Sequence, residues 1–226
     1  MDNILSFPTS TIVSKPVPKN AFYGRSNDSS LREFLTREFE GIVWLYKLAP
    51  ATLNVEDGEY VHEIDVFYCR MKEDKYSVKP FSVMDELLPR HTVFIIEYGG
   101  KFDLLMHHKE MSVVHGEQKW KCGIGEQKRD VLIESNTLNI QGQSMDAVYN
   151  GLLSQISGLS ASTKEEYKEQ VDVRKQIESI QKQIVTLQKR IKAEKQFNRQ
   201  MELNTEVRQL RKEITLLTDK LNKNNI

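Results

Sequence analysis

The stretch HTVFIIEYGGKFDLLMHHKE, residues 91–110, decides how the first part of the chain folds. Two runs rich in β-branched, aromatic and aliphatic residues flank Gly99 and Gly100. A pair of glycines accepts positive φ at both central positions of a two-residue turn between antiparallel strands. The stretch therefore predicts a β-hairpin with Gly99 and Gly100 at its turn.

Further strands are expected on both sides of this hairpin. The run IVWLYKLAP, residues 42–50, is dense in β-branched and aromatic residues and ends at a proline, and residues 52–55 could extend it. The run VHEIDVFYCRMK, residues 61–72, carries apolar side chains on both faces, which is typical of a central strand. A second strand pair is expected within residues 111–124, around Gly116.

Three segments have apolar residues at helical spacing, namely residues 31–39, 80–89 and 145–156. Gly41 is expected to end the first helix, and Gly158 the third. Prolines bound the second helix at both ends. This order of helix, strands, helix and antiparallel meander predicts an α+β fold with a small, mostly antiparallel sheet.

The chain changes character from residue 161 onward. No glycine or proline follows Gly158, and apolar residues recur at alternating steps of four and three. The two blocks are Val173, Ile177, Ile180, Ile184, Leu187 and Ile191, and then Leu203, Val207, Leu210, Ile214, Leu217 and Leu221. This heptad-like spacing predicts a coiled coil or helical hairpin. We therefore expect an extended lead-in (residues 1–20), an α+β domain (21–160) and a helical extension (161–226).

The apolar rhythm fails between Ile191 and Leu203. Over this interval a helix turns through about three full turns plus 120°. Either one continuous helix carries two stripes that face different directions, or the chain folds back within residues 192–202. The absence of glycine and proline favours the continuous helix, because turns between helices usually contain such residues.

The interrupted stretch KAEKQFNRQMELN, residues 192–204, is the predicted partner-binding surface. Basic side chains recur on one helical face, and an aromatic residue lies four positions before a methionine. The expected contact residues are Lys192, Lys195, Phe197, Asn198, Arg199, Met201 and Asn204. A solvated face, packing of Phe197 against the chain's own sheet, and phosphate contact are the alternatives.

Composition limits the classes of function. The 226 residues contain 32 basic and 32 acidic side chains, so bulk electrostatic coating of nucleic acid is not expected. No apolar run approaches the ~20 residues of a membrane helix, and the N-terminus lacks a signal-peptide pattern. A cytoplasmic protein that does not contact a membrane is expected.

No catalytic or metal-binding constellation is evident in the sequence. Carboxylates and lysines considered for a metal-dependent nuclease lack the acid, spacer, acid-x-lysine order; they are Glu63, Asp65, Lys72, Glu97, Asp103 and Lys109. The thiols of Cys69 and Cys122 form no CxxC pair. Neighbouring residues on a strand point to opposite faces, so His107 and His108 are not expected to share a metal.

Other ligand patterns are also absent from the sequence. The remaining histidines, His62, His91 and His115, have no ligand partner at short spacing. No Walker or GxGxxG loop occurs. We therefore expect no cofactor, no metal and no catalytic residue.

Three stretches carry a family resemblance. IVWLYKLAPATLNV, HTVFIIEYGGKFDLLMHHKE and EKQFNRQMELNTEVRQLRKE resemble the bacterial domain of unknown function family forty-three ninety-one, over about residues 21–220. The resemblance implies a bacterial origin and a loose association with restriction-modification, DNA helicase and phage-defence gene neighbourhoods. It implies no catalytic residues.

Together these features lead us to expect a non-catalytic interaction subunit of a bacterial complex. The helical extension would dock a larger subunit, such as a helicase or methyltransferase of a restriction or phage-defence system, or a second copy of the chain. Two alternatives remain: a divergent metal-dependent nuclease, and a nucleic-acid adaptor. The adaptor would use Trp44 and Trp120, which have basic neighbours and could stack on unpaired bases.

Overall fold

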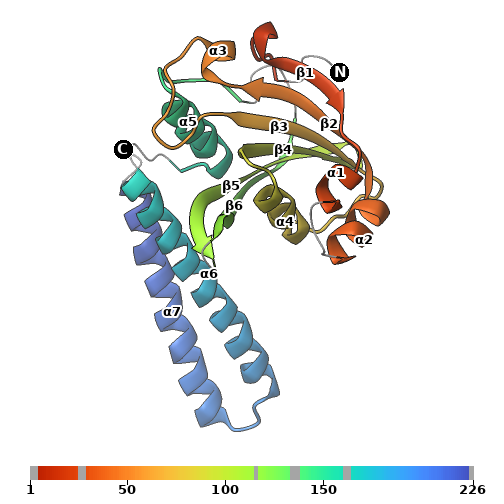
Figure 1. Ribbon diagram of the computed structural model, residues 1–226. Coiled ribbons are helices and arrows are strands. Elements are labelled where there is room, and N and C mark those ends of the chain that lie inside the picture. Colours follow the sequence, from red (N-terminus) through yellow and green to blue (C-terminus); the bar gives the residue numbers. More distant parts are fainter. Residues whose placement is uncertain (1–4, 25–28, 115–116, 133–137, 160–163, 224–226) are drawn as a thin grey trace. The chain divides into compact units, whose positions relative to one another are not determined.

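Six strands form one sheet in the order β1-β2-β3-β4-β5-β6 (Figure 1). The computed structural model describes residues 5–24, 29–114, 117–132, 138–159 and 164–223. The strands are β1 (Ile12–Pro16), β2 (Phe39–Leu48), β3 (Ile64–Met71), β4 (His91–Tyr98), β5 (Lys101–Val114) and β6 (Glu117–Val131). All neighbours pair antiparallel except β3 and β4, which confirms the predicted α+β class.

The predicted hairpin is confirmed. Gly99 and Gly100 adopt φ of 51° and 76°, and Tyr98 pairs with Lys101. Strand β5 then continues as far as Val114 and pairs with β6 along its length. The second strand pair expected within residues 111–124 is therefore the far half of two long strands.

Strand β3 is central, as its sequence predicts. It lies between β2 and β4, and its side chains from Ile64 to Cys69 are all buried. The parallel pairing of β3 with β4 requires a crossover. Helix α4 (Lys79–Leu87) lies in that crossover, and Pro80 in its first turn and Pro89 just beyond it bound the helix as expected.

Two boundaries differ from the sequence prediction. Helix α2 (Ser29–Glu38) ends before Gly41, because Gly41 already pairs with Arg70 of β3. Residues 52–55 do not extend β2, because Pro50 starts the short helix α3 (Pro50–Leu53) instead. Strand β1 lies inside the expected lead-in, and the short elements η1 (Thr9–Thr11) and α1 (Asn20–Tyr23) flank it.

Helices α2 and α4 cover the same apolar core. Phe34 of α2 packs edge-on against Phe81 of α4, and Phe81 packs against Phe94 of β4. Helix α5 (Met145–Ser157) is capped by Ser144, whose side chain accepts the Ala147 amide, and it ends at Gly158 in the left-handed conformation. Together these elements form the unit Met1–Gly158.

The second unit, Leu159–Ile226, is a helical hairpin. Helix α6 (Lys164–Ala193) and helix α7 (Phe197–Lys223) bury their two apolar stripes against each other. Lys220 Nζ lies 2.7 Å from Glu169 Oε1, which joins the ends of the helices distant from the turn. Among the described residues, no helix combines the length and apolarity needed to cross a bilayer.

The preference for one continuous helix is therefore wrong, and the chain folds back at residues 194–196. The Glu194 carboxylate accepts the amides of Lys195 and Gln196 at 2.8 and 3.0 Å. The side-chain amide of Gln200 donates to the Glu194 carbonyl at 2.7 Å. Polar side chains thus satisfy the backbone groups of the turn, and neither glycine nor proline is required.

Candidate functional site

The predicted partner-binding residues lie at the end of α6, in the turn of the helical hairpin and on the first turns of α7. All of them are exposed; they are Lys192, Lys195, Phe197, Asn198, Arg199, Met201 and Asn204. The ring of Phe197 is 72% exposed and Met201 is 50% exposed. Residues four apart share a helix face, so these two side chains form one apolar site. We call the seven residues the hairpin tip.

The hairpin tip has a basic surround. Residues 189–202 contain five basic side chains and two acidic ones. Both carboxylates are engaged: Glu194 holds the turn, and Glu202 forms an ion pair with Arg199. Backbone hydrogen bonds from Gln196 and Lys195 lower the pKa of Glu194, so it stays ionised at neutral pH. The tip therefore presents an apolar pair within a net positive surface.

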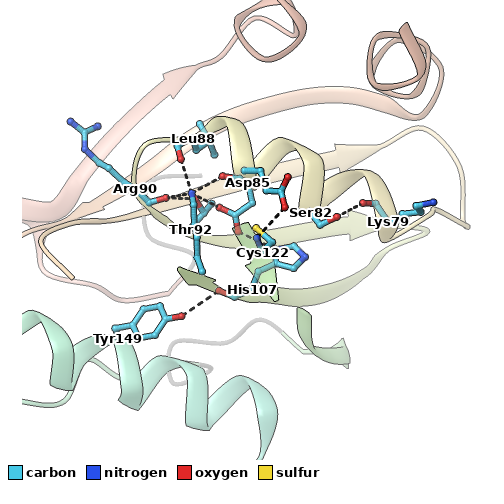
Figure 2. Close-up of polar contacts among 11 residues, drawn as sticks. Lys79, Ser82, Asp85, Leu88, Arg90, Thr92, His107, Cys122 and Tyr149 are labelled. Atoms are coloured by element: carbon cyan, nitrogen blue, oxygen red, sulfur yellow. Dashed lines mark hydrogen bonds and ion pairs between the residues drawn. The ribbon is translucent and has the colours of Figure 1, made fainter. Parts of the chain in front are cut away.

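A second candidate site lies where α4 meets β5 and β6. Asp85 of α4 is fully buried, and its Oδ2 lies 3.0 Å from Nδ1 of His107 on β5 (Figure 2). Its other oxygen, Oδ1, accepts a hydrogen bond from Lys109 Nζ at 3.1 Å. Cys122 of β6 pairs with Lys109 across the strands and faces the same helix. We call Asp85, His107 and Cys122 the buried triad.

The Lys109 ammonium supports this arrangement from one side. It donates to the main-chain oxygens of Asp85, Leu88 and Arg90 at 2.6, 2.6 and 2.7 Å. These carbonyls belong to the last turn of α4 and the residues after it; the Asp85 carbonyl also accepts the Leu88 amide at 3.1 Å. The ring of Trp120 lies 5.1 Å from the same ammonium. Lys109 therefore caps a helix and neutralises Asp85.

The local backbone explains how His107 fits beside β6. His107 pairs with Gly125, and a Cβ built on Gly125 would lie 3.0 Å from Nε2 of the imidazole. The missing side chain leaves room for the ring, and Nδ1 faces Asp85. The register shifts by one residue before the Lys109–Cys122 pair, and such a bulge re-aims the side chains beside it.

Three donors of different chemistry converge in the buried triad. One carboxylate oxygen, one imidazole nitrogen and the sulfur all lie within 4.8 Å of one another. Burial and the neighbouring Asp85 carboxylate raise the pKa of the Cys122 thiol. An oxygen, nitrogen and sulfur set at this spacing could hold a divalent transition metal.

The rings of His91, Trp120 and Tyr149 form a layer beside Lys109 and His107. His91 lies between Trp120 and Tyr149, with ring centroids 5.3 and 4.8 Å away. Burial lowers the pKa of His91 to about 4, so the ring is neutral at pH 7. The Tyr149 hydroxyl donates to the His107 carbonyl at 3.3 Å. This layer fixes the backbone of β5 beside the triad.

Both tryptophans considered for base stacking have partners within the unit. Trp120 contacts His91 and Lys109. Trp44 stacks on Phe67, and its indole N–H donates to the Tyr46 carbonyl at 3.0 Å. These contacts account for both indoles as packing residues.

Among the carboxylates considered for a nuclease, Glu97 lies far from Asp65. Glu97 is five residues along β4 from Thr92, the partner of Asp65, so about 17 Å of strand separates them. Asp103 is buried and accepts hydrogen bonds from Tyr98 Oη at 3.0 Å and from Gln127 Nε2 at 2.9 Å. Glu63 and Asp65 do lie near each other, and both face the Arg90 guanidinium, at 2.9 and 3.8 Å.

The remaining candidates have local partners. Glu63 Oε2 lies 2.9 Å from Lys47 Nζ, and Lys72 Nζ donates to the Thr36 carbonyl at 2.9 Å. His62 Nδ1 lies 3.0 Å from Asp57, and His115 is outside the described residues.

Sequence reasoning missed the buried triad because its members lie on three elements. A search for ligand pairs at short spacing does not find Asp85, His107 and Cys122. One signal was present: His107 and Lys109 are polar residues two apart on the inward face of a predicted strand. Polar side chains at core positions of a strand indicate an internal partner.

Comparison with known proteins identifies the family. The family model described as Domain of unknown function (DUF4391) matches residues 5–214, and the chain therefore belongs to that family. No curated protein and no solved structure matches the chain.

Proposed function

We propose that this member of the family is a non-catalytic interaction subunit, and that its hairpin tip binds a protein partner. The observation that supports this proposal is the exposed apolar pair: Phe197 is 72% and Met201 50% exposed on one face of α7. The partner surface would contain an apolar pocket with an acidic rim, because five basic residues lie around this pair.

The residue types at the tip suit an energetic anchor. Burial of a Phe side chain contributes about 1.5–3 kcal/mol relative to its exposed state. Aromatic residues and arginine are enriched among the residues that dominate binding energies. Phe197 begins α7, and the packed stripes of α6 and α7 hold that helix in place before a partner binds. This preorganisation reduces the entropic cost of association.

The family resemblance suggests the setting. A restriction or phage-defence complex with a DNA helicase or methyltransferase would supply the larger partner. We place this complex in the cytoplasm, where the free thiols Cys69 and Cys122 would remain reduced. Contact with nucleic acid would then be indirect, through the partner.

Co-purification tests this proposal. The full chain is co-expressed with the proteins encoded beside its gene, and the complex is isolated through a tag on the partner. Phe197→Ala with Arg199→Ala should reduce recovery of the chain at least tenfold, while its circular dichroism spectrum stays unchanged. Leu216→Ala is the matched control, because Leu216 is 70% exposed on α7 outside the tip. Equal recovery of the double variant and the wild type would remove the docking role.

A nucleic-acid role for the tip has its own outcome. The basic residues could contact phosphates, and such binding weakens steeply as the salt concentration rises. If the isolated chain binds DNA or RNA with that salt dependence, and Lys192→Glu with Lys195→Glu abolishes the binding, phosphate contact at the tip replaces the protein-docking proposal.

A further inference from the structure

We propose that the buried triad of Asp85, His107 and Cys122 binds a zinc ion that joins α4 to β5 and β6. The three donor atoms lie within 4.8 Å of one another, and each comes from a different element (Figure 2). Asp85 is fully buried and His107 is 3% exposed, so two of the ligands are already withdrawn from water. This metal site is independent of the hairpin tip.

The donor set favours zinc among the common divalent cations. Calcium and magnesium take oxygen ligands almost entirely, whereas zinc accepts carboxylate oxygen, imidazole nitrogen and thiolate sulfur. In a tetrahedral site, zinc–ligand distances of about 2.0–2.3 Å place two ligand atoms about 3.3–3.8 Å apart. Asp85 Oδ2 and His107 Nδ1 are 3.0 Å apart, and the Cys122 sulfur, within 4.8 Å of both, would move by at most about 1 Å to reach this spacing.

The orientation of each group fits coordination. Asp85 Oδ1 is held by Lys109 at 3.1 Å, so Oδ2 is the oxygen that faces His107. The Nε2 edge of His107 lies against Gly125, so Nδ1 is the nitrogen available to the ion. Lys109 thus acts as a positioning residue, since it orients the carboxylate without touching the metal.

The ligand charges match a divalent ion. The Asp85 carboxylate and a Cys122 thiolate together supply two negative charges, and Lys109 remains hydrogen-bonded to Asp85 Oδ1. The binding step would form the zinc–sulfur bond and release the thiol proton to water, and the ring proton that Nδ1 shares with Asp85 would move to Nε2 so that Nδ1 can coordinate the ion.

Cys122 is the half-buried member of the triad, and its amide donates to Glu86 Oε1 at 3.1 Å. Glu86 also lies 3.8 Å from Lys121 in a partly exposed ion pair. The ion would enter from this side, and a water molecule would complete its four-coordinate shell.

Cobalt and zinc titrations of the full chain test the site after metal is removed with a chelator. We expect one cobalt ion per chain, a thiolate-to-cobalt charge-transfer absorption, and loss of that absorption when zinc is added. Cys122→Ser should abolish the absorption. Cys69→Ser is the matched control, because Cys69 is a fully buried thiol outside the triad.

Alkylation of the wild-type chain tests the site without any substitution, so the result does not depend on whether a variant folds. Zinc should slow alkylation of Cys122 in the native wild type at least tenfold, as measured by peptide mass spectrometry. No stoichiometric cobalt binding by the wild type would overturn the proposal. So would charge-transfer absorption that persists in Cys122→Ser, or an alkylation rate at Cys122 that zinc leaves unchanged.

Discussion

Among the described residues, the buried charged side chains lie in the sheet unit and not in the helical hairpin. In the sheet unit, charged groups such as Asp85 and Lys109 are buried and bonded to each other. In the hairpin, the apolar side chains of Phe197 and Met201 are exposed beside the turn. Partnered buried charges hold structure in place, whereas exposed apolar groups at a well-held turn are free to bind another molecule. The docking role that we propose for the hairpin tip rests on its exposed apolar pair.

The largest expected effect tests whether the buried charges are structural. Lys109→Ala should destabilise the sheet unit by about 3–5 kcal/mol, because it leaves the Asp85 carboxylate buried without its cation. It also removes the donor to three carbonyls at the end of α4. Urea unfolding followed by tryptophan fluorescence measures the change, since Trp44 and Trp120 both lie in this unit.

Lys101→Ala is the control for that experiment. Lys101 pairs with Asp130 at 3.0 Å, but both side chains are largely exposed, so the expected change is below about 0.5 kcal/mol. Similar losses from the two substitutions would contradict the structural role of Lys109.

The second-largest effect tests whether the apolar core between α6 and α7 stabilises the hairpin. Leu203→Ala should cost about 2–3 kcal/mol, because Leu203 is 4% exposed and packs in the α6–α7 core. Hydrogen exchange should rise in α6 and α7 and stay unchanged in β3 and β4, since the chain divides into two units. An equal loss of protection from hydrogen exchange in both units would show that the two units unfold together.

The smallest effect concerns a buried charge that is incompletely partnered. Asp65 is 4% exposed, and among the described residues its Oδ1 has no hydrogen-bond partner. Burial, and then the Glu63 carboxylate, raise the pKa of Asp65 to about 6. The folded state therefore binds the Asp65 proton more tightly than the unfolded state. The contribution of Asp65 to the free energy of unfolding is most favourable below about pH 4 and decreases as pH rises to about 6.

Asp65→Asn isolates this contribution. The difference in unfolding free energy between the variant and the wild type should shift by about 1–2 kcal/mol in favour of the variant as pH rises from 4 to 7. Urea unfolding at several pH values measures it. A difference that does not vary with pH would show that folding does not raise the pKa of Asp65.

Local chemistry explains which elements the sequence predicted. Gly99 and Gly100 specify their turn through backbone freedom, and Ser144 and Gly158 cap α5 at both ends. Alternating or continuous apolar runs identified β3 and β4. Each of these features depends on residues close together in the chain, so the sequence contains the whole signal. The prediction that Gly41 ends the first helix was wrong, because β2 begins before Gly41 and pairs there with β3. No local sequence pattern indicates that pairing.

The sequence by itself determined the α+β class, the β4–β5 hairpin and the two apolar stripes of the extension. Only the tertiary structure decided that the stripes face each other, because Glu194 and Gln200 build a turn without glycine or proline. It also brought together Asp85, His107 and Cys122. Their proximity depends on the β5–β6 register and on how α4 packs over it, and long-range packing of this kind leaves no trace in residue spacing.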